Sequence, residues 1–575
     1  MERGIGTSRG IGIGHVLIVY NASAVVNRGT HYNAEEEKKR FFEARKTFIE
    51  QTEELLSELE KKLGESDKDA LVLKNQIYLA RDITTENEVV AAIDNSHICA
   101  EAAFDDVCNK LIQLFSSMDN PDMQQRVTDI QDMRERMIQT LQGTKAFDLT
   151  NLPDNTVIVA DEIKPSMTAS MDIAHVAGIV AEKGGDTAHA SILARALEIP
   201  AVLSVKGILQ KVKNGDSIII DGAYGEVFIN PTQRTFSIYE KKKKKYEEHI
   251  EELKTFINKS TETADGKKVM LAANIGGADE AAKAVKAGAE GVGLFRTEFL
   301  FLNKNALPTE EEQFEEYKKA AVLTKGMPLT IRTLDIGGDK DIPYMGLTKE
   351  TNPFLGYRAI RLCLDRVDIF TTQLRAILRA SAYGSIRIMI PMITSVNEVR
   401  QVKDMIKKIC SDLDHNGISY DKNIQTGVMI ETPAAAIMAD AIAQEVDFFS
   451  IGTNDLTQYT IAVDRCNENV AYLYSAFNPA VLRLIRRIIE CAHNAGIEAG
   501  MCGEAAANAL MAPILLSFGL DEFSVSTGKV LETRKTIADW SLKEAGLVTD
   551  KVMSMATEKE VTDYLSDYLS ERNKK

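Results

Sequence analysis

One histidine stands in a setting that favours covalent phosphoryl chemistry. Residues 184–195 read GGDTAHASILAR, and the pattern after His189 predicts a helix whose inward side carries Ile192, Leu193 and Leu197. A histidine at a helix start lies beside free backbone N–H groups and the positive end of the helix dipole, which both favour an anion. An imidazole is also a nucleophile at neutral pH. His189 is therefore a candidate phosphoryl carrier, and the alternative is a histidine that only packs beneath a glycine turn.

Two carboxylates follow apolar segments in the C-terminal half. Residues 448–459 read FFSIGTNDLTQY, which predicts a buried strand and then a glycine turn that presents Asn454 and Asp455. Glu431 ends the apolar run before it. Two hard oxygen ligands suit Mg²⁺, which takes one or two carboxylates and completes its shell with substrate oxygens and water. These residues predict a magnesium site, and the alternative is a surface turn with a capping aspartate.

Four arginines add positive charge to the same half of the chain. Arg296 and Arg332 directly follow apolar strand-like residues, and Arg358 and Arg465 lie further on. An arginine at the end of a buried strand needs an anion or a carboxylate, because an unpaired buried charge is very costly. Ion pairing within the protein is the alternative for each one alone. Together they exceed what two carboxylates need, and the planar fork of arginine matches phosphate oxygens.

A single cysteine completes this set of candidate residues. Cys502 follows the apolar segment that begins at Glu498. A buried cysteine is usually inert filling. Beside a site that forms an enolate, its thiol is instead positioned to deliver a proton to carbon.

These residues need a scaffold, and the C-terminal half predicts one. Apolar strand patterns alternate with helical stretches over about 300 residues, as in a (β/α)8 TIM barrel. The chemistry-bearing residues fall at or just past the ends of the strands, where barrel enzymes build their active sites. The eight predicted strands are Val269–Asn274, Gly291–Arg296, Leu329–Asp335, Ile386–Met392, Gly427–Glu431, Phe448–Gly452, Glu498–Cys502 and Glu522–Ser526.

The N-terminal half predicts an α/β domain interrupted by helices. Residues 1–20 end in an apolar strand, and short strands return from about Thr156. Between them lie long amphipathic helices, with one apolar stripe that begins at Phe41. We therefore expect an α/β phosphohistidine domain of residues 1–20 plus 146–231, with a helical subdomain of residues 21–145 inserted into it.

A polar helix is expected to connect the two halves. Residues 232–260 contain the run Lys241 to Lys245 followed by acidic residues, a pattern typical of a solvated helix face. This linker helix leaves residues 261–575 for the barrel.

Composition narrows the class of protein. The chain has 575 residues and a formal net charge of −16, which argues against nucleic acid as the main partner. The sequence contains no run of about eighteen apolar residues, so we expect no membrane span. The N-terminus has no signal-peptide pattern. Seven scattered cysteines without CxxC spacing favour reduced thiols. We expect a cytoplasmic protein.

Two segments carry a resemblance to a known family. The GGxTxHxxIxAR pattern of residues 184–195 and the strand-ending segment 448–459 resemble Enzyme I of the phosphoenolpyruvate-dependent sugar phosphotransferase system, the phosphoenolpyruvate–protein phosphotransferases. The resemblance runs from Gly4 to the last predicted barrel strand. In that family a phosphoryl group passes from phosphoenolpyruvate to the active-site histidine and then to the phosphocarrier protein HPr.

The resemblance implies a role for each candidate residue. His189 would carry the phosphoryl group, Cys502 would protonate the enolate to pyruvate, and Glu431 and Asp455 would hold Mg²⁺. Residues 21–145 would dock HPr, and the barrel would form a homodimer. The residues that would bind phosphoenolpyruvate or support the site are Arg296, Arg332, Arg358, Asn454, Asp455, Arg465 and, beside the imidazole, Thr168.

The chain departs from the family pattern at a few positions. Asp186 stands where a basic or apolar residue is commoner, Ala188 replaces a frequent serine, and Cys466 replaces a usual glycine. Residues 76–81 differ from the acidic, methionine-containing pattern typical of the docking helices. The preferred carrier therefore stays open.

The implied chemistry requires movement and has two rivals. His189 has to reach the barrel and later leave it for HPr, which predicts a domain swing about residues 232–260. One rival is pyruvate phosphate dikinase or phosphoenolpyruvate synthase, but those enzymes need a nucleotide-binding domain for which no length remains. The other is a non-catalytic signalling paralogue, which the intact set of candidate residues disfavours.

Overall fold

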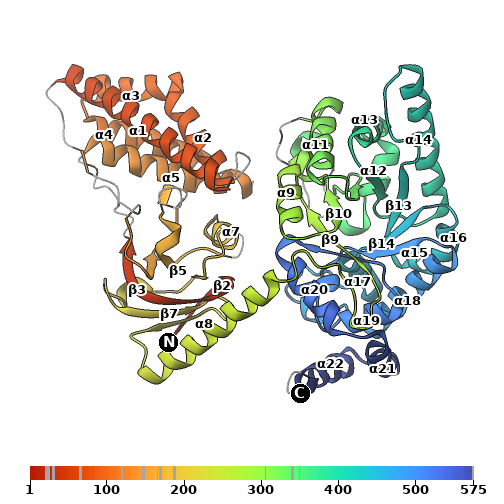
Figure 1. Cartoon of the computed structure of the whole chain (residues 1–575). Coiled ribbons are helices and arrows are strands. Elements are labelled where there is room, and N and C mark those ends of the chain that lie inside the picture. Colours follow the sequence, from red (N-terminus) through yellow and green to blue (C-terminus); the bar gives the residue numbers. More distant parts are fainter. Residues whose placement is uncertain are drawn as a thin grey trace. The chain divides into compact units, whose positions relative to one another are not determined.

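A computed structural model gives the fold of most of the chain (Figure 1). It describes residues 1–19, 26, 28, 33–63, 68–117, 121–144, 149, 151–164, 166–167, 171–185, 189–302, 304, 306–337, 342–348 and 350–572. The chain divides into two compact units, Met1–Ile250 and Glu251–Lys575. The predicted fold class is confirmed, with an α/β sheet and a helical bundle in the first unit and a closed eight-stranded barrel in the second.

One sheet forms the base of the first unit. Its strands follow the order β1-β8-β7-β3-β4-β5-β6-β2. β3 pairs in parallel with β4 and antiparallel with β7, so a strand that precedes the helices completes a sheet made from residues that follow them. This pairing agrees with a helical insertion. The strands are β1 Glu2–Arg3, β2 Ile5–Ser8, β3 Ile11–Val19, β4 Thr156–Ala160, β5 Val176–Ala181, β6 Ala201–Leu203, β7 Ser217–Asp221 and β8 Glu226–Ile229.

Three of these strands are not predicted from the sequence. β1 and β2 are short pieces ahead of β3, and the chain bends between β2 and β3 at Gly10, which has a φ of 122° that favours glycine. β8 returns beside β7 through a turn at Gly225, whose φ is 66°. Each piece is too short for a period of two to be visible in the sequence.

The helical bundle buries the apolar stripes that the sequence predicts. Phe41, Phe48 and Leu59 of α1 are buried, as are Met133 and Met137 of α5. The bundle helices are α1 Ala34–Leu63, α2 Lys68–Arg81, α3 Ile83–Ser96, α4 Ala100–Ser116 and α5 Pro121–Leu141.

Two further helices belong to this part of the chain. α7 (His189–Ala196) is the helix predicted after the glycine pair, and Leu193 is buried as expected. α8 (Gln233–Lys254) is shorter than the predicted 232–260. After α8 ends at Lys254, the buried Arg534 donates to the carbonyl oxygens of Phe256 and Ile257, with Nη1–O distances of 2.9 and 3.2 Å.

All eight predicted barrel strands exist, and neighbours pair in parallel around the closed ring. Several end earlier than predicted; β11, for example, stops at Arg332 rather than Asp335. The strands are β9 Met270–Ile275, β10 Gly291–Arg296, β11 Leu329–Arg332, β12 Ile386–Ile390, β13 Gln425–Ile430, β14 Phe448–Ile451, β15 Glu498–Met501 and β16 Glu522–Ser526.

Helices surround this barrel (Figure 1). Strand residues are buried on both faces, which explains their continuous apolar runs. Capping boxes begin α11 at Thr309 and α14 at Ser395. The helices are α9 Ala278–Lys286, α10 Phe299–Leu302, α11 Glu310–Leu323, α12 Ala359–Asp365, α13 Val367–Ala380, α14 Val396–His415, α15 Pro433–Ile437, α16 Ala439–Ala443, α17 Thr453–Ile461, α18 Pro479–Asn494, α19 Ala512–Phe518, α20 Val530–Asp539, α21 Leu542–Met553 and α22 Glu558–Arg572.

Within the described residues, every helix is either too short or too polar to cross a lipid bilayer.

Candidate active site

The barrel brings the predicted C-terminal residues to one end. Arg296 and Arg332 are the last residues of β10 and β11, and Glu431 directly follows β13. Asp455 lies in the first turn of α17, directly after β14, and Cys502 directly follows β15. Since all eight strands run parallel around the barrel, these positions share its carboxyl end.

Arg332 is buried between two carboxylates that sequence reasoning did not assign. Its Nη2 lies 2.5 Å from Glu298 Oε1 and its Nη1 lies 2.9 Å from Asp335 Oδ2. Burial alone would lower the pKa of Arg332, but the charges of Glu298 and Asp335 outweigh it and raise that pKa. The guanidinium is thus held in one orientation as a permanent cation.

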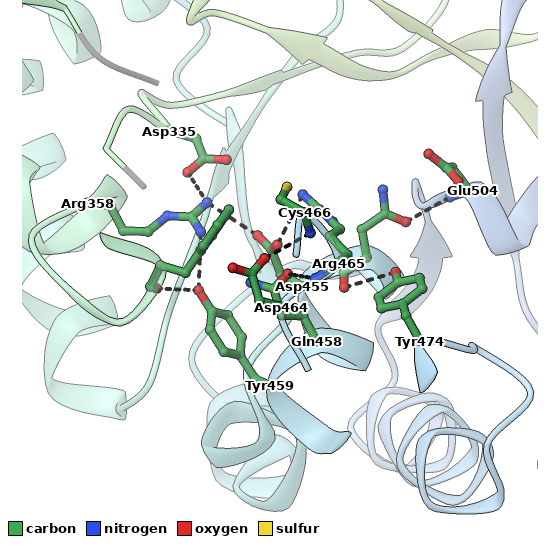
Figure 2. A network of polar contacts seen from close by, with 12 residues as sticks. Asp335, Arg358, Asp455, Gln458, Tyr459, Asp464, Arg465, Cys466, Tyr474 and Glu504 are labelled. Carbon is green, nitrogen blue, oxygen red and sulfur yellow. Dashed lines mark hydrogen bonds and ion pairs between the residues drawn. The ribbon is translucent and has the colours of Figure 1, made fainter. Parts of the chain in front are cut away.

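Arg358 links two parts of the rim (Figure 2). This buried residue precedes α12, and its Nη2 lies 2.9 Å from Asp335 Oδ1 and 3.3 Å from Asp455 Oδ2. Arg465 Nη2 lies 3.5 Å from the other oxygen of Asp455. Asp335 thereby joins Arg332 to Arg358, and Asp455 joins Arg358 to Arg465.

Glu431 and Asp455 place buried carboxylates among these arginines. Glu431 is 2 % exposed and its Oε1 accepts a hydrogen bond from the main-chain N–H of Met392 at 2.6 Å. Burial, and then the charges of Asp455 and Asp335, raise the pKa of Glu431. A carboxylate cluster of this kind is relieved by a cation.

The donor set fits Mg²⁺. Asp455 Oδ1 is buried and has no hydrogen-bond partner within the described parts of the chain, apart from the long ion pair to Arg465. Glu431 and Asp455 are two hard oxygen donors, the number that Mg²⁺ takes when substrate and water supply the rest. Among the described residues, no group of three or more His, Cys, Asp or Glu side chains is arranged to hold a metal ion.

The arginines keep hydrogen-bonding capacity for a ligand. An N–H donor that is buried without a partner costs free energy, so it indicates a missing acceptor. Four rim arginines each have a buried guanidinium nitrogen with no hydrogen-bond partner among the residues that the structure describes: Arg296 Nε, Arg332 Nε, Arg358 Nε and Arg465 Nη1. An anion with several oxygens would satisfy such a set.

Cys502 is buried beneath the rim. It packs with Leu294, Met389, Met429 and Phe448 inside the barrel. Its Sγ lies 3.8 Å from the main-chain oxygen of Ile451. Burial raises the pKa of the thiol to about 11, so the group keeps its proton at neutral pH. Its surroundings therefore fit both alternatives, apolar filling and a proton donor.

Asn454 lies beside Asp455 in the first turn of α17. Its side-chain oxygen accepts a hydrogen bond from the main-chain N–H of Glu504 at 3.4 Å, and its main-chain oxygen accepts one from Tyr474 at 3.1 Å. The side chain and the main chain of Asn454 are therefore each held by a segment outside its own helix.

The histidine region is described only in part. His189 is the first residue of α7, which agrees with the predicted helix start, but its side chain lies outside the described residues. Thr168, Asp186 and Ala188 also lie outside them. Before this helix, Gly184 has a φ of 103°, and the carbonyl oxygen of Gly185 accepts a hydrogen bond from Ser191 at 2.5 Å.

Sequence reasoning missed Glu298 and Asp335. Each follows a strand-ending arginine, by two residues in Arg296-Thr297-Glu298 and by three in Arg332-Thr333-Leu334-Asp335. That spacing is the signal that could have identified them, but their partners depend on the fold. Glu298 pairs with Arg332 of the neighbouring strand, and Asp335 pairs with Arg358 within the connection after β11.

Comparison with known proteins settles the family. Three family models match in order along the chain: "PEP-utilising enzyme, N-terminal" over residues 3–126, "PEP-utilising enzyme, mobile domain" over 152–225 and "PEP-utilising enzyme, PEP-binding domain" over 250–542. The phosphoenolpyruvate-protein phosphotransferase of Bacillus sp. (strain S) is 43% identical over 98% of this chain and 97% of its own length. The chain belongs to the phosphoenolpyruvate-protein phosphotransferase family.

Further relatives of that name agree. The phosphoenolpyruvate-protein phosphotransferase of Priestia megaterium is 42% identical over 98% of both chains, and that of Bacillus subtilis (strain 168) is 42% identical over 98% of this chain and 99% of its own. The mobile-domain match contains His189, and the PEP-binding-domain match contains every candidate residue of the barrel. This end-to-end similarity favours a phosphotransferase over the nucleotide-dependent rival.

Proposed function

We propose that this phosphoenolpyruvate-protein phosphotransferase transfers the phosphoryl group of phosphoenolpyruvate to its own His189 and then to the carrier HPr, releasing pyruvate. It would act as the first general component of a sugar phosphotransferase system. One observation carries the proposal most strongly: four rim arginines each retain a buried nitrogen without an acceptor, around the carboxylates of Glu431 and Asp455. Family membership and the position of His189 at a helix start support the same reaction.

The arginines would bind and orient phosphoenolpyruvate. Arg296, Arg332 and Arg465, with the amide of Asn454, would contact the phosphate and carboxylate oxygens. Arg358 would support them through its pairs with Asp335 and Asp455. Phosphoryl transfer mainly requires such positioning and the neutralisation of charge.

Glu431 and Asp455 would hold a Mg²⁺ ion. When bound, the ion would supply positive charge that neutralises the phosphate oxygens. The raised pKa of Glu431 and the free oxygen of Asp455 support this assignment, because bound cation would compensate both.

The chemical step would form one bond and break another. The imidazole of His189 attacks phosphorus in line, a nitrogen–phosphorus bond forms, and the bond from phosphorus to the enol oxygen breaks. The enolate then takes the proton of Cys502 at its methylene carbon and becomes pyruvate, and the thiolate recovers a proton from water. The raised pKa of Cys502 supports the donor role, since the thiol is protonated at neutral pH. Thr168 would contact the imidazole.

The remaining parts of the chain would bring His189 to the barrel and to HPr. The helices within residues 21–145 would dock HPr, and the barrel of residues 261–575 would form a homodimer. The α/β domain of residues 1–20 plus 146–231 would carry His189 between the barrel and HPr by a swing about the linker of residues 232–260. We propose that the protein acts in the cytoplasm without nucleic-acid or membrane partners.

Labelling tests the function directly. The protein is incubated with phosphoenolpyruvate labelled in its phosphate, with Mg²⁺, as wild type and as His189→Ala. We expect acid-labile label on the wild type, transfer of that label to added HPr, and none on the variant. Label that survives on the variant would refute the histidine assignment. Formation of phosphoenolpyruvate from ATP and pyruvate would instead support the nucleotide-dependent rival.

A further inference from the structure

Two tyrosine hydroxyls support the rim without belonging to the set of proposed ligands. Tyr459 lies on α17, and Tyr474 lies in the connection between α17 and α18. Figure 2 shows both at the network that contains Arg358, Asp455 and Arg465. Each hydroxyl joins a segment that carries a candidate binding group to a second segment of the barrel.

The hydroxyl of Tyr459 both donates and accepts a hydrogen bond. The O–H donates to the main-chain oxygen of Phe354 at 2.5 Å, and the oxygen accepts from Arg358 Nη1 at 3.2 Å. The hydroxyl therefore ties the segment before α12 to α17, the helix whose first turn carries Asn454 and Asp455.

The contact with Tyr459 decides where Arg358 points. The Nη2 of Arg358 is shared between Asp335 and Asp455, at 2.9 and 3.3 Å, while its Nη1 is held by Tyr459. Without the hydroxyl, Nη1 loses that acceptor and the guanidinium is free to turn more fully toward Asp455. That rotation would bring the positive guanidinium closer to Asp455, so the carboxylate would attract a cation less strongly.

Tyr474 contacts the first turn of α17, which carries Asn454 and Asp455. Its hydroxyl donates to the main-chain oxygen of Asn454 at 3.1 Å, while the side chain of Asn454 is held from the opposite segment by Glu504. Tyr474 also contacts Arg465, whose pKa is lowered by burial but raised overall by Asp455 and then by this tyrosine. The first turn of α17 is thus fixed by groups that lie beyond the helix itself.

We propose that Tyr459 and Tyr474 are positioning residues for phosphoenolpyruvate, and that their hydroxyls preset Arg358 and Asn454 before the substrate arrives. The inference rests on the proposed function, because it takes phosphoenolpyruvate as the ligand of the rim. A hydrogen bond to a charged or buried group that is already formed lowers the cost of ordering that group on binding.

Tyrosine-to-phenylalanine variants test the proposal because they remove only the hydroxyl. Tyr472→Phe is the matched control: Tyr472 is two residues from Tyr474 and 79% exposed. For Tyr459→Phe and Tyr474→Phe we expect the KM for phosphoenolpyruvate to rise about threefold to tenfold with kcat within about twofold of wild type. The control should match wild type in both constants.

A second measurement separates binding from activity. Phosphoenolpyruvate with Mg²⁺ should raise the melting temperature of the wild type more than that of either variant, each measured against the same protein without ligand. Unchanged KM and an unchanged ligand-induced shift in both variants would overturn the proposal. Equal loss in the Tyr472→Phe control would do the same, since it would show a general effect of removing a hydroxyl.

The two proposals fail in different ways. If wild type bound phosphoenolpyruvate without forming phosphohistidine, the proposed function would be wrong. The ligand-induced shift in melting temperature would still test whether the two tyrosines position the ligand-binding groups. A double variant adds a further check: Tyr459→Phe combined with Arg358→Lys should weaken binding by less than the product of the two single effects, because both changes act on one contact. Independent, multiplying effects would contradict a positioning role for Tyr459.

Discussion

At the scale of single residues, the rim combines firmly held charges with unused hydrogen-bonding groups. Arg332 is paired on two nitrogens, to Glu298 and Asp335, and keeps its buried Nε without a partner. Such a group is already oriented before a ligand binds, so little reorganisation is needed when charge develops on the substrate. Exchanges that preserve charge but alter geometry should therefore be costly here.

Arg332→Lys tests this expectation. An ammonium cannot span Glu298 and Asp335 in one plane, so we expect kcat/KM for phosphoenolpyruvate to fall about 100-fold while the protein stays folded. The measurement is phosphoenolpyruvate-dependent phosphorylation of HPr. Arg366→Lys, at an exposed pair with Asp368, should change nothing and serves as control. Full activity of Arg332→Lys would show that charge alone suffices.

The reactivity of Cys502 offers a second residue-scale prediction. With a pKa raised to about 11, only about 0.1% of the thiol is thiolate at pH 8. Alkylation of Cys502 by iodoacetamide should be slow at pH 8 and should speed up about tenfold per pH unit until the pH approaches that pKa. Mass spectrometry of the peptides measures it, with the exposed Cys466 as internal reference. Equal labelling of both at pH 8 would contradict the burial argument.

Residue types and strand ends predicted most of the rim. Arg296, Arg332, Glu431 and Cys502 were assigned from sequence because each ends an apolar run, and the barrel places them at one end. Partner identities could not be predicted in this way. Asp335 contacts Arg358 across 23 residues, and that pairing depends on how the connection after β11 folds back.

At the scale of elements, close packing at strand ends holds the side chains in place. Gly452 follows β14, and a Cβ there would lie 2.8 Å from Glu431 Oε2 and 2.9 Å from Glu431 Cβ. The absence of a side chain at this position is what lets the carboxylate lie beside the next strand. The glycine therefore has a steric role that a turn prediction alone does not reveal.

Gly452→Ala should displace Glu431 without unfolding the barrel. We expect Mg²⁺ to be required at about 10- to 100-fold higher concentration for half-maximal activity, because the carboxylate that we propose as a Mg²⁺ ligand moves. A titration of activity against Mg²⁺ measures the change. Gly546→Ala on α21 is the control, since nothing lies within 4 Å of a Cβ there. An unchanged Mg²⁺ requirement in Gly452→Ala would count against Glu431 as a ligand.

Element type followed from pattern more reliably than element ends. The barrel strands alternate regularly with helical patterns, which the sequence shows directly, whereas β1, β2 and β8 lack such a repeat and a visible period. α8 ends before its predicted limit, and the chain directly after it is held by Arg534, nearly 280 residues later, which donates to the carbonyl oxygens of Phe256 and Ile257. Long-range contacts of this kind have no local signal.

At the scale of the whole molecule, the proposed cycle depends on the helix between the two units. α8 contains the boundary between them, and its central lysines are solvent-exposed pairs with acidic residues one turn on. Such pairs contribute little stability each, so the loss of one should change little. We expect a break in the backbone of α8 to slow phosphoryl transfer to His189 and to leave substrate binding unchanged.

Lys244→Pro should separate these two properties. Proline in a helix interior costs about 3 kcal/mol and kinks the helix. We expect the single-turnover rate of His189 labelling by phosphoenolpyruvate to fall at least about tenfold, while the ligand-induced rise in melting temperature of the barrel persists. Lys244→Ala removes the exposed pair with Glu248 and should behave as wild type. Unaltered labelling in the proline variant would argue that the linker is not a mechanical part of the cycle.

The contacts of Arg534 have a mechanical consequence. This arginine is 1% exposed and donates to Phe256, Ile257, Gly288 and Thr261, so the chain directly after α8 is anchored to the barrel. Freedom to pivot must then lie upstream of that anchor, and a 22-residue helix acts as a lever about 33 Å long. A tilt of about 10° at the anchored end would carry the far end by about 6 Å, so in the proposed swing a small angular change at the base would become a long displacement of the domain that carries His189.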